Sequence, residues 1–544
     1  MSAQPFDFDV AIVGYGPSGV TAANFLGQYG ISTGAFERTK DIYSRARAVT
    51  MDDYTLRLMQ QAGLDGDLLA DMDPRSVLRW KTYAGKEFLR VTPSDSGFGQ
   101  PASSQIFQPA VEKTLRRGAE RHSSVAVHYG EEVSSVIQDP EGVTLTVRNL
   151  DAGTERTVRA RYLLACDGGS SRVRESLGMD LQGKSKPTVW VIVDAKVKKW
   201  WPERDLLTFW SDAERPVVDI PLSLNHHRWE LPLRGHEKKE DFESREALWE
   251  LLAPFGVTGD NVEILQHAFY THHILMAKQW RNGRVFLVGD AAHMMPPWAG
   301  QGMQSGIRDA HNIAWKLREV LTGRMSDSLL DEYQAEREPH VREMTKLAET
   351  LGFFIEEGNP AKVALRNTVL PVLQRLPKIG PVIREFRFKP QPMVKAGLLG
   401  AAPARGSAVG RMVPQPTVSL PAGRRLKLDD ALGDGFAVVG IDTDPRTAMT
   451  PEQVAGWDGL GAVFRTVRSP KSAPGTDTDL MDYDDAVGIW ARKHKARIVV
   501  LRPDRFVYTT DRTGLDTPRQ ATQGAEPRPS QKDAVRPTQA APVG

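Results

Sequence analysis

A glycine-rich turn near the N-terminus constrains the fold of this chain more than any other feature. Residues 9–13 (DVAIV) form a short apolar run typical of a buried strand. The turn GYGPSG at 14–19 follows at once, and the apolar stretch VTAANFL then continues as a helix. Strand, GxGxxG and helix in this order are the context that a dinucleotide-binding unit requires. The sequence therefore predicts a Rossmann-like domain.

Each glycine of this turn has its own task. Gly14 allows the tight turn, Gly16 lets a pyrophosphate approach the backbone, and Gly19 lets the helix pack closely on the strand. The first helical turn, which Pro17 and Ser18 begin, offers free N–H groups and the positive end of the helix dipole to the phosphates.

An acidic residue stands where a ribose-binding residue is expected. Glu37 lies 18 residues beyond Gly19, at the end of a second predicted strand over 32–36. It is well placed to accept hydrogen bonds from a ribose hydroxyl. Arg38 follows it, and we assign both residues to the cofactor site.

Two polar residues that follow Glu37 in the chain, Arg47 and Gln108, fit a flavin cofactor better than a nicotinamide cofactor. Arg47 precedes a helix predicted over 52–62, together with Arg45, and an arginine there can pair with a pyrophosphate. Gln108 opens another predicted helix. Taken alone, a surface arginine and a helix cap explain these positions equally well.

Two further strands end in a turn that carries an aspartate. The strand predicted over 162–166 leads into Asp167 and Gly168, and the apolar run over 284–288 leads into Gly289 and Asp290. The second turn continues as AAHMMPPWAGQGMQSG, a loop stiffened by prolines and opened by glycines, before an amphipathic helix begins. The backbone of this loop can approach a flat ligand closely.

These motifs in this order resemble the class A flavoprotein aromatic hydroxylases, the para-hydroxybenzoate and phenol hydroxylase superfamily. The resemblance covers residues 8 to 400 and rests on the GxGxxG, DG and GD motifs. Within the superfamily the likeness is closest to the hydroxyphenylpropionate hydroxylase branch, through ACDGGSSRVRESLG, QGMQSGIRDAHNIAWKL, RFKPQP and VVLRPDRFV. It implies FAD as the bound cofactor and NADH or NADPH as co-substrate.

The resemblance also assigns roles in the GD loop. It implies that Asp290 binds the ribitol chain of FAD, and that Pro296 and Pro297 pass beside the isoalloxazine ring. It implies that the helix beginning at Gly302 points its N-terminus at the pyrimidine end of the flavin, where backbone N–H groups stabilise negative charge.

One position departs from the family pattern, which often has asparagine where this chain has Gln304. The backbone N–H of residue 304 can still donate to the flavin after that change. A contact from the longer glutamine side chain to the flavin is not implied. The predicted cofactor-binding residues are Gly14, Gly16, Pro17, Ser18, Gly19, Glu37, Arg38, Arg47, Gln108, Asp167, Gly168, Gly289, Asp290, Pro297, Gly300, Gly302, Met303 and Gln304.

The chain between 181 and 275 changes character. Strand-like runs separated by turn residues indicate an antiparallel sheet, at 188–197, 206–210, 217–222 and 228–233. By resemblance this sheet roofs the active site. Arg228, Tyr270 and His272 are the candidate catalytic residues, with Arg228 also a candidate anchor for a substrate carboxylate and Glu230 within reach of the site. An ordinary sheet surface explains each of them equally well.

Composition excludes several other classes of function. Basic and acidic residues nearly balance, at 70 against 68, so no polyanionic partner is implied. The single cysteine, Cys166, rules out an internal disulfide and fits a reducing compartment. No His, Cys or acidic cluster has metal-ligand spacing, so we expect no metal, and His293 reads as a packing residue of the loop. Without a signal peptide or a membrane-length apolar run, we expect a soluble, cytoplasmic protein.

A glycine-, alanine- and proline-rich boundary near residue 400 precedes an alternation of strands and a helix, which indicates a small α/β domain. It resembles the thioredoxin-like C-terminal domain of the phenol hydroxylase branch. Because it contains no cysteine, thiol–disulfide exchange is excluded, and we expect a role in assembly or stability. The predicted fold is α/β, with a Rossmann-like FAD-binding domain, an inserted antiparallel-sheet substrate domain and a thioredoxin-like domain. The expected boundaries are 1–180 and 276–400 for the two parts of the FAD-binding domain, 181–275 for the substrate sheet, 410–513 for the thioredoxin-like domain and 514–544 for a disordered tail.

The expected activity is insertion of one oxygen atom of O₂ beside a phenolic hydroxyl, with NAD(P)H as reductant. The expected substrate is a small phenolic acid, 3-(3-hydroxyphenyl)propionate or 3-hydroxycinnamate, converted to the 2,3-dihydroxy product in aromatic catabolism. Another phenol or a polycyclic aromatic, and a flavin dehydrogenase or oxidase, stay open as alternatives, as does a homodimer. No nucleic-acid or membrane partner is expected.

Overall fold

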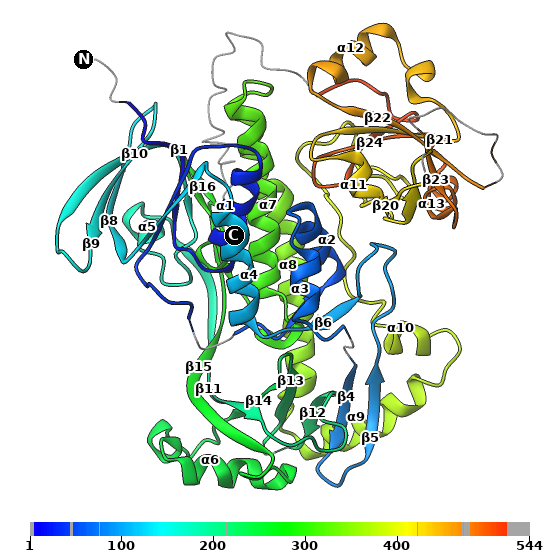
Figure 1. Cartoon of the computed structure of the whole chain (residues 1–544). Helices are drawn as coiled ribbons and strands as arrows, with labels where there is room; N and C mark the ends of the chain where they lie inside the picture. The colour runs from blue at the N-terminus through cyan, green and yellow to red at the C-terminus, as the bar shows by residue number, and fades with distance from the viewer. Residues whose placement is uncertain are drawn as a thin grey trace, which may run out of the picture.

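The computed structural model describes residues 5–43, 47–74, 77–213, 215–421, 423–470, 472 and 479–518. Arg45 and most of the predicted tail lie outside these residues. Three large sheets organise the described chain, and each has its own layer of helices (Figure 1). Two of them meet at the cavity described below, and the third forms a separate C-terminal domain.

The first sheet has a parallel centre in the order β17-β10-β1-β2-β7. Its strands are β1 (Phe8–Val13), β2 (Thr33–Glu37), β7 (Val125–Tyr129), β10 (Glu155–Ala165), β16 (Arg281–Asn282) and β17 (Val285–Leu287). An antiparallel pair, β8 (Glu131–Gln138) and β9 (Val143–Asn149), extends it beside β10. The central strands β1, β10 and β17 carry apolar, buried runs at residues 10–13, 162–165 and 285–287, and together with their parallel pairing these runs confirm the Rossmann-like prediction.

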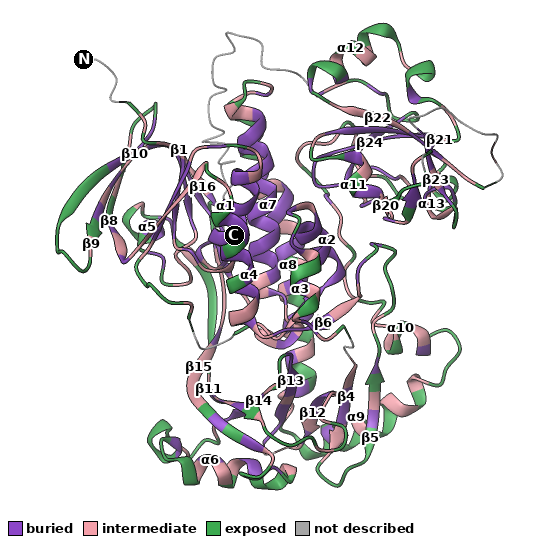
Figure 2. Ribbon diagram, in the orientation of Figure 1, coloured by how far each residue is buried: buried purple, intermediate pink, exposed green. Residues whose placement is uncertain are grey.

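The helices of this domain form its most buried part (Figure 2). They are α1 (Pro17–Gln28), α2 (Asp53–Gln61), α3 (Asp65–Ala70), α4 (Gln108–Glu120), α5 (Arg172–Ser176), α7 (Gly302–Leu321) and α8 (Glu332–Ile355). α7 packs against α1, α2 and α8 and is buried on nearly all sides. A short ladder of β3 (Thr50–Asp52) and β6 (Ser103–Gln105) joins the chain before α2 to the segment before α4.

The second sheet is antiparallel in all pairs but one and has the order β18-β15-β11-β14-β13-β12-β4-β5. Its strands are β4 (Leu78–Thr82), β5 (Glu87–Val91), β11 (Leu181–Val197), β12 (Leu207–Ser211), β13 (Val217–Leu222), β14 (His226–Pro232), β15 (Val262–Ala277) and β18 (His293–Met294). The antiparallel substrate sheet is thus present as predicted. β4 and β5, however, come from within residues 1–180, where only the FAD-binding domain was expected.

Three helices cover the outer parts of the second sheet: α6 (Arg245–Leu252), α9 (Pro360–Leu373) and α10 (Gly380–Arg384). α9 and α10 lie against β5 at the far edge of the sheet (Figure 1). Within the described residues, no helix is both long and apolar enough to cross a bilayer.

The third sheet is mixed and has the order β20-β19-β23-β22-β21-β24-β25. Its elements are β19 (Thr417–Ser419), β20 (Arg425–Lys427), α11 (Leu428–Leu432), β21 (Ala437–Ile441), α12 (Pro451–Gly459), β22 (Val463–Arg468), β23 (Asp479–Asp482), α13 (Ala486–Lys493), β24 (Ile498–Leu501) and β25 (Val507–Thr510). β21 pairs in parallel with β22 and antiparallel with β24, and β24 pairs antiparallel with β25. This is the strand order of a thioredoxin-like core.

Buried ion pairs join the C-terminal domain to the first domain. Arg57 of α2 donates to both carboxylate oxygens of Asp429, at 2.7 and 2.8 Å. Arg502 lies 2.5 Å from Glu336 of α8, which also binds Lys316 of α7 at 2.6 Å. These side chains are at most 1% exposed, so the two domains share one buried polar core.

Candidate active site

A cavity of about 1340 Å³ lies between the carboxyl ends of the first sheet and the inner face of the second. All the predicted cofactor and catalytic residues line it except two glycines, Gly19 and Gly289. Both glycines serve packing instead. A Cβ on Gly19 would lie 2.0 Å from the carbonyl oxygen of Gly14, and one on Gly289 would lie 2.4 Å from Ser18 Oγ.

The glycine-rich turn meets one end of the cavity with an open backbone. Gly14 has a φ of +91°, and a Cβ there would lie 2.5 Å from the carbonyl oxygen of Cys166, so only glycine fits. A Cβ on Gly16 would meet no protein atom within 4 Å, which leaves room at the cavity wall. No side chain caps the N-terminus of α1 that begins at Pro17. Its first N–H groups therefore remain available to an anionic ligand.

Glu37 has a structural task in addition to its place on the cavity wall. One carboxylate oxygen accepts the backbone N–H of Tyr15 at 2.7 Å, and the other accepts the N–H and hydroxyl of Thr39. The carboxylate therefore fixes the glycine-rich turn while its edge still faces the cavity, beside Arg38. A ribose contact by Glu37 stays a prediction.

Arg116 of α4 lies at the same end and was missed by the sequence reasoning. Its guanidinium lies over the rings of Tyr15 and Tyr129, 5.5 and 5.2 Å from their centroids. The residue is 9% exposed, and its Nε has no hydrogen-bond partner among the described residues. A buried cation on this wall suits a phosphate. No sequence motif identifies Arg116, because the residues around it in α4 show only the usual pattern of an amphipathic helix.

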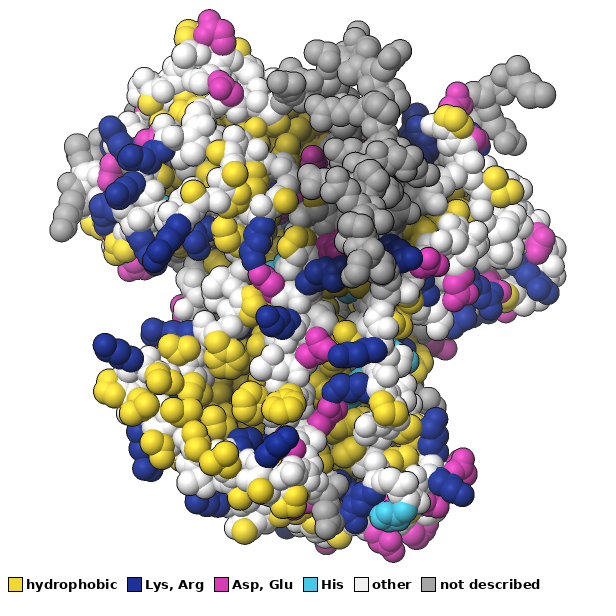
Figure 3. Space-filling model, turned by 180° about the vertical axis from the view of Figure 1, so that it is seen from behind, with side chains coloured by type: hydrophobic (Ala, Val, Ile, Leu, Met, Phe, Trp, Pro, Cys, Tyr) yellow, Lys and Arg dark blue, Asp and Glu magenta, His cyan; other side chains and the backbone are white. Residues whose placement is uncertain are grey.

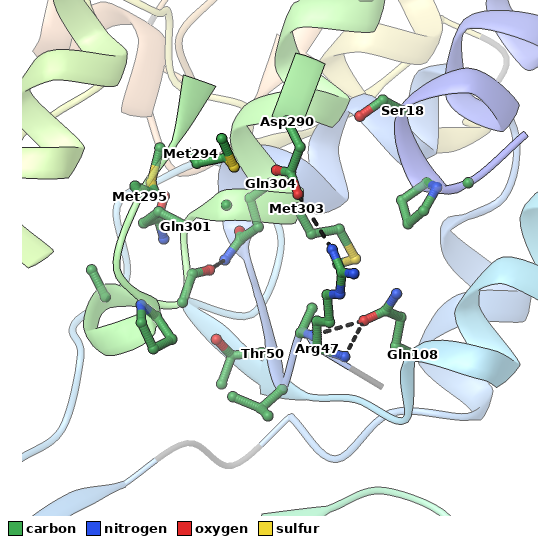
Figure 4. A pocket seen from close by; sticks show the side chains of 18 of the residues that line it. Ser18, Arg47, Thr50, Gln108, Asp290, Met294, Met295, Gln301, Met303 and Gln304 are labelled. Atoms are coloured by element: carbon green, nitrogen blue, oxygen red, sulfur yellow. Dashed lines mark hydrogen bonds and ion pairs between the residues drawn. The ribbon is translucent and has the colours of Figure 1, made fainter. Parts of the chain in front are cut away.

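Two charged side chains face each other across the cavity (Figure 4). Arg47 Nη1 lies 3.6 Å from Asp290 Oδ2, and the two side chains are 72% and 40% exposed. The side-chain oxygen of Gln108 accepts the backbone N–H groups of Arg47 and Ala48, each at 2.7 Å. Gln108 thus holds the Arg47 segment in place, while Asp290 keeps its carboxylate directed into the cavity.

The proline-glycine loop leads directly into α7. Gly300 has a φ of +59° and Gly302, where α7 begins, has open space where a Cβ would stand. No side chain caps the N-terminus of α7. Of the two prolines, Pro297 lines the cavity, and Pro296 is not among the lining residues. Met303 reaches the cavity from the first turn of the helix (Figure 4).

The side chain of Gln304 makes its hydrogen bonds within the protein rather than to the cavity. Its oxygen accepts the N–H of Asp52 at 2.9 Å and the hydroxyl of Thr55 at 3.0 Å, and its amide donates to the carbonyl of Gly300 at 2.6 Å. It therefore fixes the loop against the start of α2. The remaining contribution of Gln304 to a ligand is its backbone N–H.

The residues present fit FAD. Two helices with uncapped N-termini, α1 and α7, point at one cavity, as a diphosphate and the pyrimidine edge of a flavin require. The open positions at Gly16 and Gly302 give the backbone access that a close ligand needs. Asp167 adds a buried carboxylate oxygen without a partner among the described residues, and burial raises the pKa of Asp167. Asp167 and Gly168 both line the cavity.

The other end of the cavity has apolar walls from both sheet and loop. Trp80 of β4 stacks on Phe209 of β12 with the ring centroids 4.5 Å apart. The apolar lining at this end consists of Leu78, Trp80, Ile192, Leu207, Phe209, Val218, Ile220, Trp298, Leu351, Ile355 and Phe386. Sequence reasoning named none of them as site residues, because they come from seven separate segments, of which only the one with Trp298 belongs to a motif.

A chain of four polar side chains runs along this end of the second sheet. The hydroxyl of Tyr270 donates to Glu230 at 2.8 Å, and Glu230 lies 3.8 Å from Arg228. Arg228 in turn donates from Nε and Nη2 to Asp194, at 2.7 and 3.0 Å. Burial raises the pKa of Glu230 while the Arg228 guanidinium lowers it. The pKa of Tyr270 is raised well above its ordinary value by burial and by Glu230.

The contact with Asp194 bears on the prediction that Arg228 is a candidate anchor for a substrate carboxylate. The side chain does reach the cavity wall, but its charge is already balanced by the two-point contact with Asp194. A substrate carboxylate would therefore compete with an existing ion pair.

His272 stands between two tryptophans at the same end. Its ring stacks on Trp190 and meets Trp298 edge-on, with centroid distances of 5.4 and 4.9 Å. It is 2% exposed, and neither ring nitrogen has a hydrogen-bond partner among the described residues. The nearest carboxylate oxygen belongs to Glu356, 3.7 Å from Nδ1. Both ring nitrogens are buried, so the hydrogen-bonding capacity of His272 is not used by the described residues.

His293, by contrast, uses one ring nitrogen in a buried contact behind the loop. Its Nε2 lies 2.6 Å from Asp309, whose other oxygen accepts from Arg337 at 2.8 Å. All three side chains are buried. This is the packing role predicted for His293. Within the described part of the chain, no group of three or more His, Cys, Asp or Glu side chains is arranged to hold a metal ion.

Comparison with known proteins gives consistent results. Residues 7–348 match the FAD binding domain family, and residues 410–524 match the HcaD C-terminal domain family. The chain is 38% identical over 516 residues to 3-(3-hydroxy-phenyl)propionate/3-hydroxycinnamic acid hydroxylase of Burkholderia cenocepacia (strain HI2424), covering 93% of this chain and 94% of the relative. It is 36% identical over 509 residues to the hydroxylase of the same name from Escherichia coli (strain K12), covering 92% and 91%. The crystal structure of the flavin-dependent monooxygenase PieE, in complex with FAD and substrate, superposes with a TM-score of 0.75 at 22% identity, covering 93% of this chain and 96% of that one.

Proposed function

The chain belongs to the FAD-binding monooxygenase family, as an FAD-dependent aromatic hydroxylase, and from this premise we propose that it hydroxylates a phenolic acid at the position next to the phenolic hydroxyl. The proposed substrate is 3-(3-hydroxyphenyl)propionate or 3-hydroxycinnamate, and the product is the corresponding 2,3-dihydroxy acid of aromatic catabolism. The balanced reaction consumes one NAD(P)H, one proton and one O₂ for each catechol, NAD(P)⁺ and water formed.

FAD, when bound, supplies the redox chemistry of this reaction, in which reduced flavin activates O₂ for transfer of one oxygen atom. We assign the diphosphate to the N-terminus of α1 with Arg47 and Arg116, the ribitol to Asp290, and the pyrimidine edge to the backbone N–H groups of Met303 and Gln304. Helix N-termini and cations on these walls match the negative charge of each part.

The observation that carries the proposed chemistry is the Tyr270–Glu230 pair, which lines the cavity at the end that has apolar walls. A phenol becomes a strong carbon nucleophile at its ortho position when it loses its proton. We propose that the Tyr270 hydroxyl accepts the phenolic proton while it gives its own proton to Glu230. Burial raises the pKa of Glu230 toward working pH, where a general base is most effective.

Arg228 acts on this pair from behind rather than on the substrate. At 3.8 Å it favours the charged form of Glu230 and so limits the effect of burial. Asp194 holds the guanidinium in place through two hydrogen bonds. In this assignment Arg228 is a positioning residue.

We assign the substrate carboxylate to His272. Its ring nitrogens have no other hydrogen-bond partner among the described residues, and Trp190 and Trp298 fix the ring plane. The aromatic and aliphatic walls would hold the phenyl ring and exclude water from the reaction site, which limits side reactions.

A second candidate is a larger neutral phenol, including a polycyclic one. It is favoured by the commitment of Arg228 to Asp194 and by the extent of the apolar wall. An oxidase or dehydrogenase that only reduces O₂ to peroxide is the other alternative.

A matched substrate panel tests the proposal. Purified protein with FAD is assayed for NADH or NADPH oxidation and for catechol with 3-(3-hydroxyphenyl)propionate, with 3-phenylpropionate, which lacks the phenol, and with 3-ethylphenol, which lacks the carboxylate. We expect catechol and stimulated oxidation with the first compound alone. Equal turnover of 3-ethylphenol would favour the neutral phenol, and no catechol from any of them would remove this substrate class.

A further inference from the structure

Exposed apolar side chains gather on one part of this molecule. Eighteen large hydrophobic residues of the described chain are exposed, and nine of them fall between residues 353 and 388. These nine, which we call the α9–α10 face, are Phe353, Phe354, Leu365, Val369, Val372, Leu376, Ile379, Val382 and Phe388. Figure 3 shows hydrophobic side chains massed over the part of the molecule where Figure 1 draws these helices. Single exposed apolar residues are ordinary, whereas a contiguous group marks an interaction surface.

The periodicity of α9 shows that this exposure follows a pattern. Leu365, Val369 and Val372 are spaced four and three residues apart, so they lie on one face of the helix, and Leu376 follows just beyond its end. In an ordinary surface helix that face turns toward the core. Here these four side chains are 40–64% exposed, and Val363 is the buried residue of the helix. The helix therefore presents its apolar face outward.

The border of the α9–α10 face is basic. Residues 353–388, over which this face extends, contain six Lys or Arg residues and three Glu residues, and each glutamate already pairs with a cation: Glu356 with Lys186, Glu357 with Lys362 and Glu385 with Arg387. Arg375, Lys378 and Arg384 are exposed, and none of the three has a carboxylate within ion-pair distance among the residues the structure describes. Arg384 does donate a hydrogen bond to the carbonyl of Gln374, which keeps its guanidinium at this border.

The charge of this border decides between two kinds of partner. In a symmetric dimer the same patch of both copies meets, so two basic borders would face each other without acidic partners. An anionic lipid surface offers the complementary charge and an apolar layer at the same time. Cationic amphipathic helices that lie in the headgroup region combine these two properties.

The same segment also forms part of the cavity wall. Leu351, Ile355 and Phe386 line the apolar end of the cavity, and Arg387 and Lys389 line it as well. A lipid surface in contact with the α9–α10 face would thus adjoin the end of the cavity that we assign to the aromatic substrate. A neutral phenol, the second candidate substrate, partitions into lipid, so this position would shorten its route to the cavity.

We propose that the α9–α10 face binds the surface of an anionic lipid bilayer, with its apolar side chains in the headgroup region and Arg375, Lys378 and Arg384 against the lipid phosphates. The binding is peripheral and reversible. It goes beyond the hydroxylase activity and does not depend on the identity of the phenolic substrate.

Vesicle flotation of the full-length, FAD-loaded protein tests this proposal. Vesicles of phosphatidylcholine alone are compared with vesicles that also contain phosphatidylglycerol. We expect the protein to float with the anionic vesicles, to remain behind with the neutral ones, and to lose binding as salt is raised toward about 1 M, where charges are screened within about 3 Å.

Two variants and one control locate the surface. R375E/K378E and V369S/V372S should each lose vesicle binding by at least tenfold, while Ile489→Ser, an exposed apolar residue of the C-terminal domain, should leave it unchanged. Flavin content and catechol formation in free solution should be unaffected in all three. Absence of flotation with anionic vesicles would overturn the proposal. So would a homodimer that V369S/V372S dissociates, because the face would then be a subunit interface.

Discussion

Single residues of the cavity can be tested by their effect on FAD binding. Asp290 is the clearest case, since its carboxylate faces the cavity and has one distant partner, Arg47 at 3.6 Å. Removing a charge-assisted hydrogen bond to the ribitol should cost about 1.5–3 kcal/mol. We therefore expect Asp290→Ala to raise the dissociation constant of FAD roughly 10- to 150-fold, measured by flavin fluorescence. Asp180→Ala, at an exposed position outside the cavity, serves as the control.

Full retention of FAD by Asp290→Ala would remove Asp290 from the cofactor site. Glu37→Ala should weaken FAD to a similar degree, both by loss of the expected ribose contact and because the Tyr15 N–H loses its acceptor. An unchanged FAD affinity in that variant would mean that the turn holds without Glu37 and that the ribose binds elsewhere.

The proposed base can be tested by pH. The charged form of Glu230 accepts the proton, so activity should fall as pH drops through its pKa, which burial raises above the ordinary 4.5. We expect Glu230→Gln to abolish this acid limb in the pH profile of kcat/KM for catechol formation, with FAD retained. Tyr270→Phe should lower the same parameter by roughly 10²- to 10⁴-fold, the usual contribution of proton transfer. An acid limb that is unchanged in Glu230→Gln would contradict the assignment.

The residue scale also shows what sequence reasoning can reach. Gly14, Gly16 and Asp290 belong to local motifs whose chemistry depends on spacing, and all three line the cavity. Trp80 and Glu356 have no such pattern, because folding alone brings them to the site. Gln304 shows a third outcome, in which the position was predicted correctly but the side chain bonds to Asp52 and Gly300 instead of facing the ligand.

Among the secondary structure elements, α7 connects cofactor site and core. It begins at the cavity with Gly302 and is buried on nearly all sides further along. His311 in this buried part packs edge-on against Phe25 of α1, with the ring centroids 4.4 Å apart. Burial lowers the pKa of His311 to about 3, with Asp504 opposing the shift and nearby Arg and Lys residues adding to it.

The lowered pKa of His311 predicts that the protein becomes less stable as the pH falls. Because the folded state binds the proton less readily than the unfolded state, the stability contributed by neutral His311 is complete above pH 6.5 and is lost as pH falls from 6.5 toward about 3. One such group lowers the free energy of unfolding by about 1.4 kcal/mol per pH unit. We expect His311→Leu to flatten the slope measured by urea unfolding between pH 6.5 and 4.5 by that amount, and His236→Leu, at an exposed position, to leave it unchanged. Equal slopes in the two variants would contradict the shift.

Elements were predicted well where the local pattern is strong. β13 spans Val217–Leu222, the predicted range, and most other predicted strands and helices differ by one or two residues at an end. β4 and β5 were not predicted. They are short strands that join the edge of a sheet formed by later residues, and the local sequence does not show which strand they pair with. The turn residues likewise did not indicate how long β11 and β15 are, since both strands continue from one domain into the other.

At the level of the whole molecule, the C-terminal domain is not an independent attachment. Asp429 and Arg502 supply the partners of Arg57 and Glu336, which belong to the first domain and are fully buried. A chain that ends near residue 405 would leave Arg57 without a carboxylate partner and Glu336 with Lys316 as its remaining cation, which costs several kcal/mol. We expect such a chain to be insoluble or free of FAD. If it were folded and FAD-loaded, the shared polar core would be dispensable.

A point substitution tests the same coupling more finely. Arg57→Leu should lower the free energy of unfolding by about 3–5 kcal/mol, since it leaves the Asp429 carboxylate without its two-point partner. Arg446→Ala breaks a two-point pair with Asp458 on the surface of the same domain and should cost about 0–1 kcal/mol. Similar losses in the two variants, measured by urea unfolding, would show that burial does not set the strength of these pairs.

The assignment of the whole molecule as an oxygen-inserting enzyme is tested most directly by labelled oxygen. Purified protein with FAD is given 3-(3-hydroxyphenyl)propionate, NADH or NADPH, and ¹⁸O₂, and the product is analysed by mass spectrometry. Oxygen insertion should place one ¹⁸O atom in the new hydroxyl group of the 2,3-dihydroxy product and consume one reduced nicotinamide for each product molecule. Nicotinamide oxidation that yields only labelled hydrogen peroxide, with no labelled catechol from this substrate or from larger phenols, would contradict it.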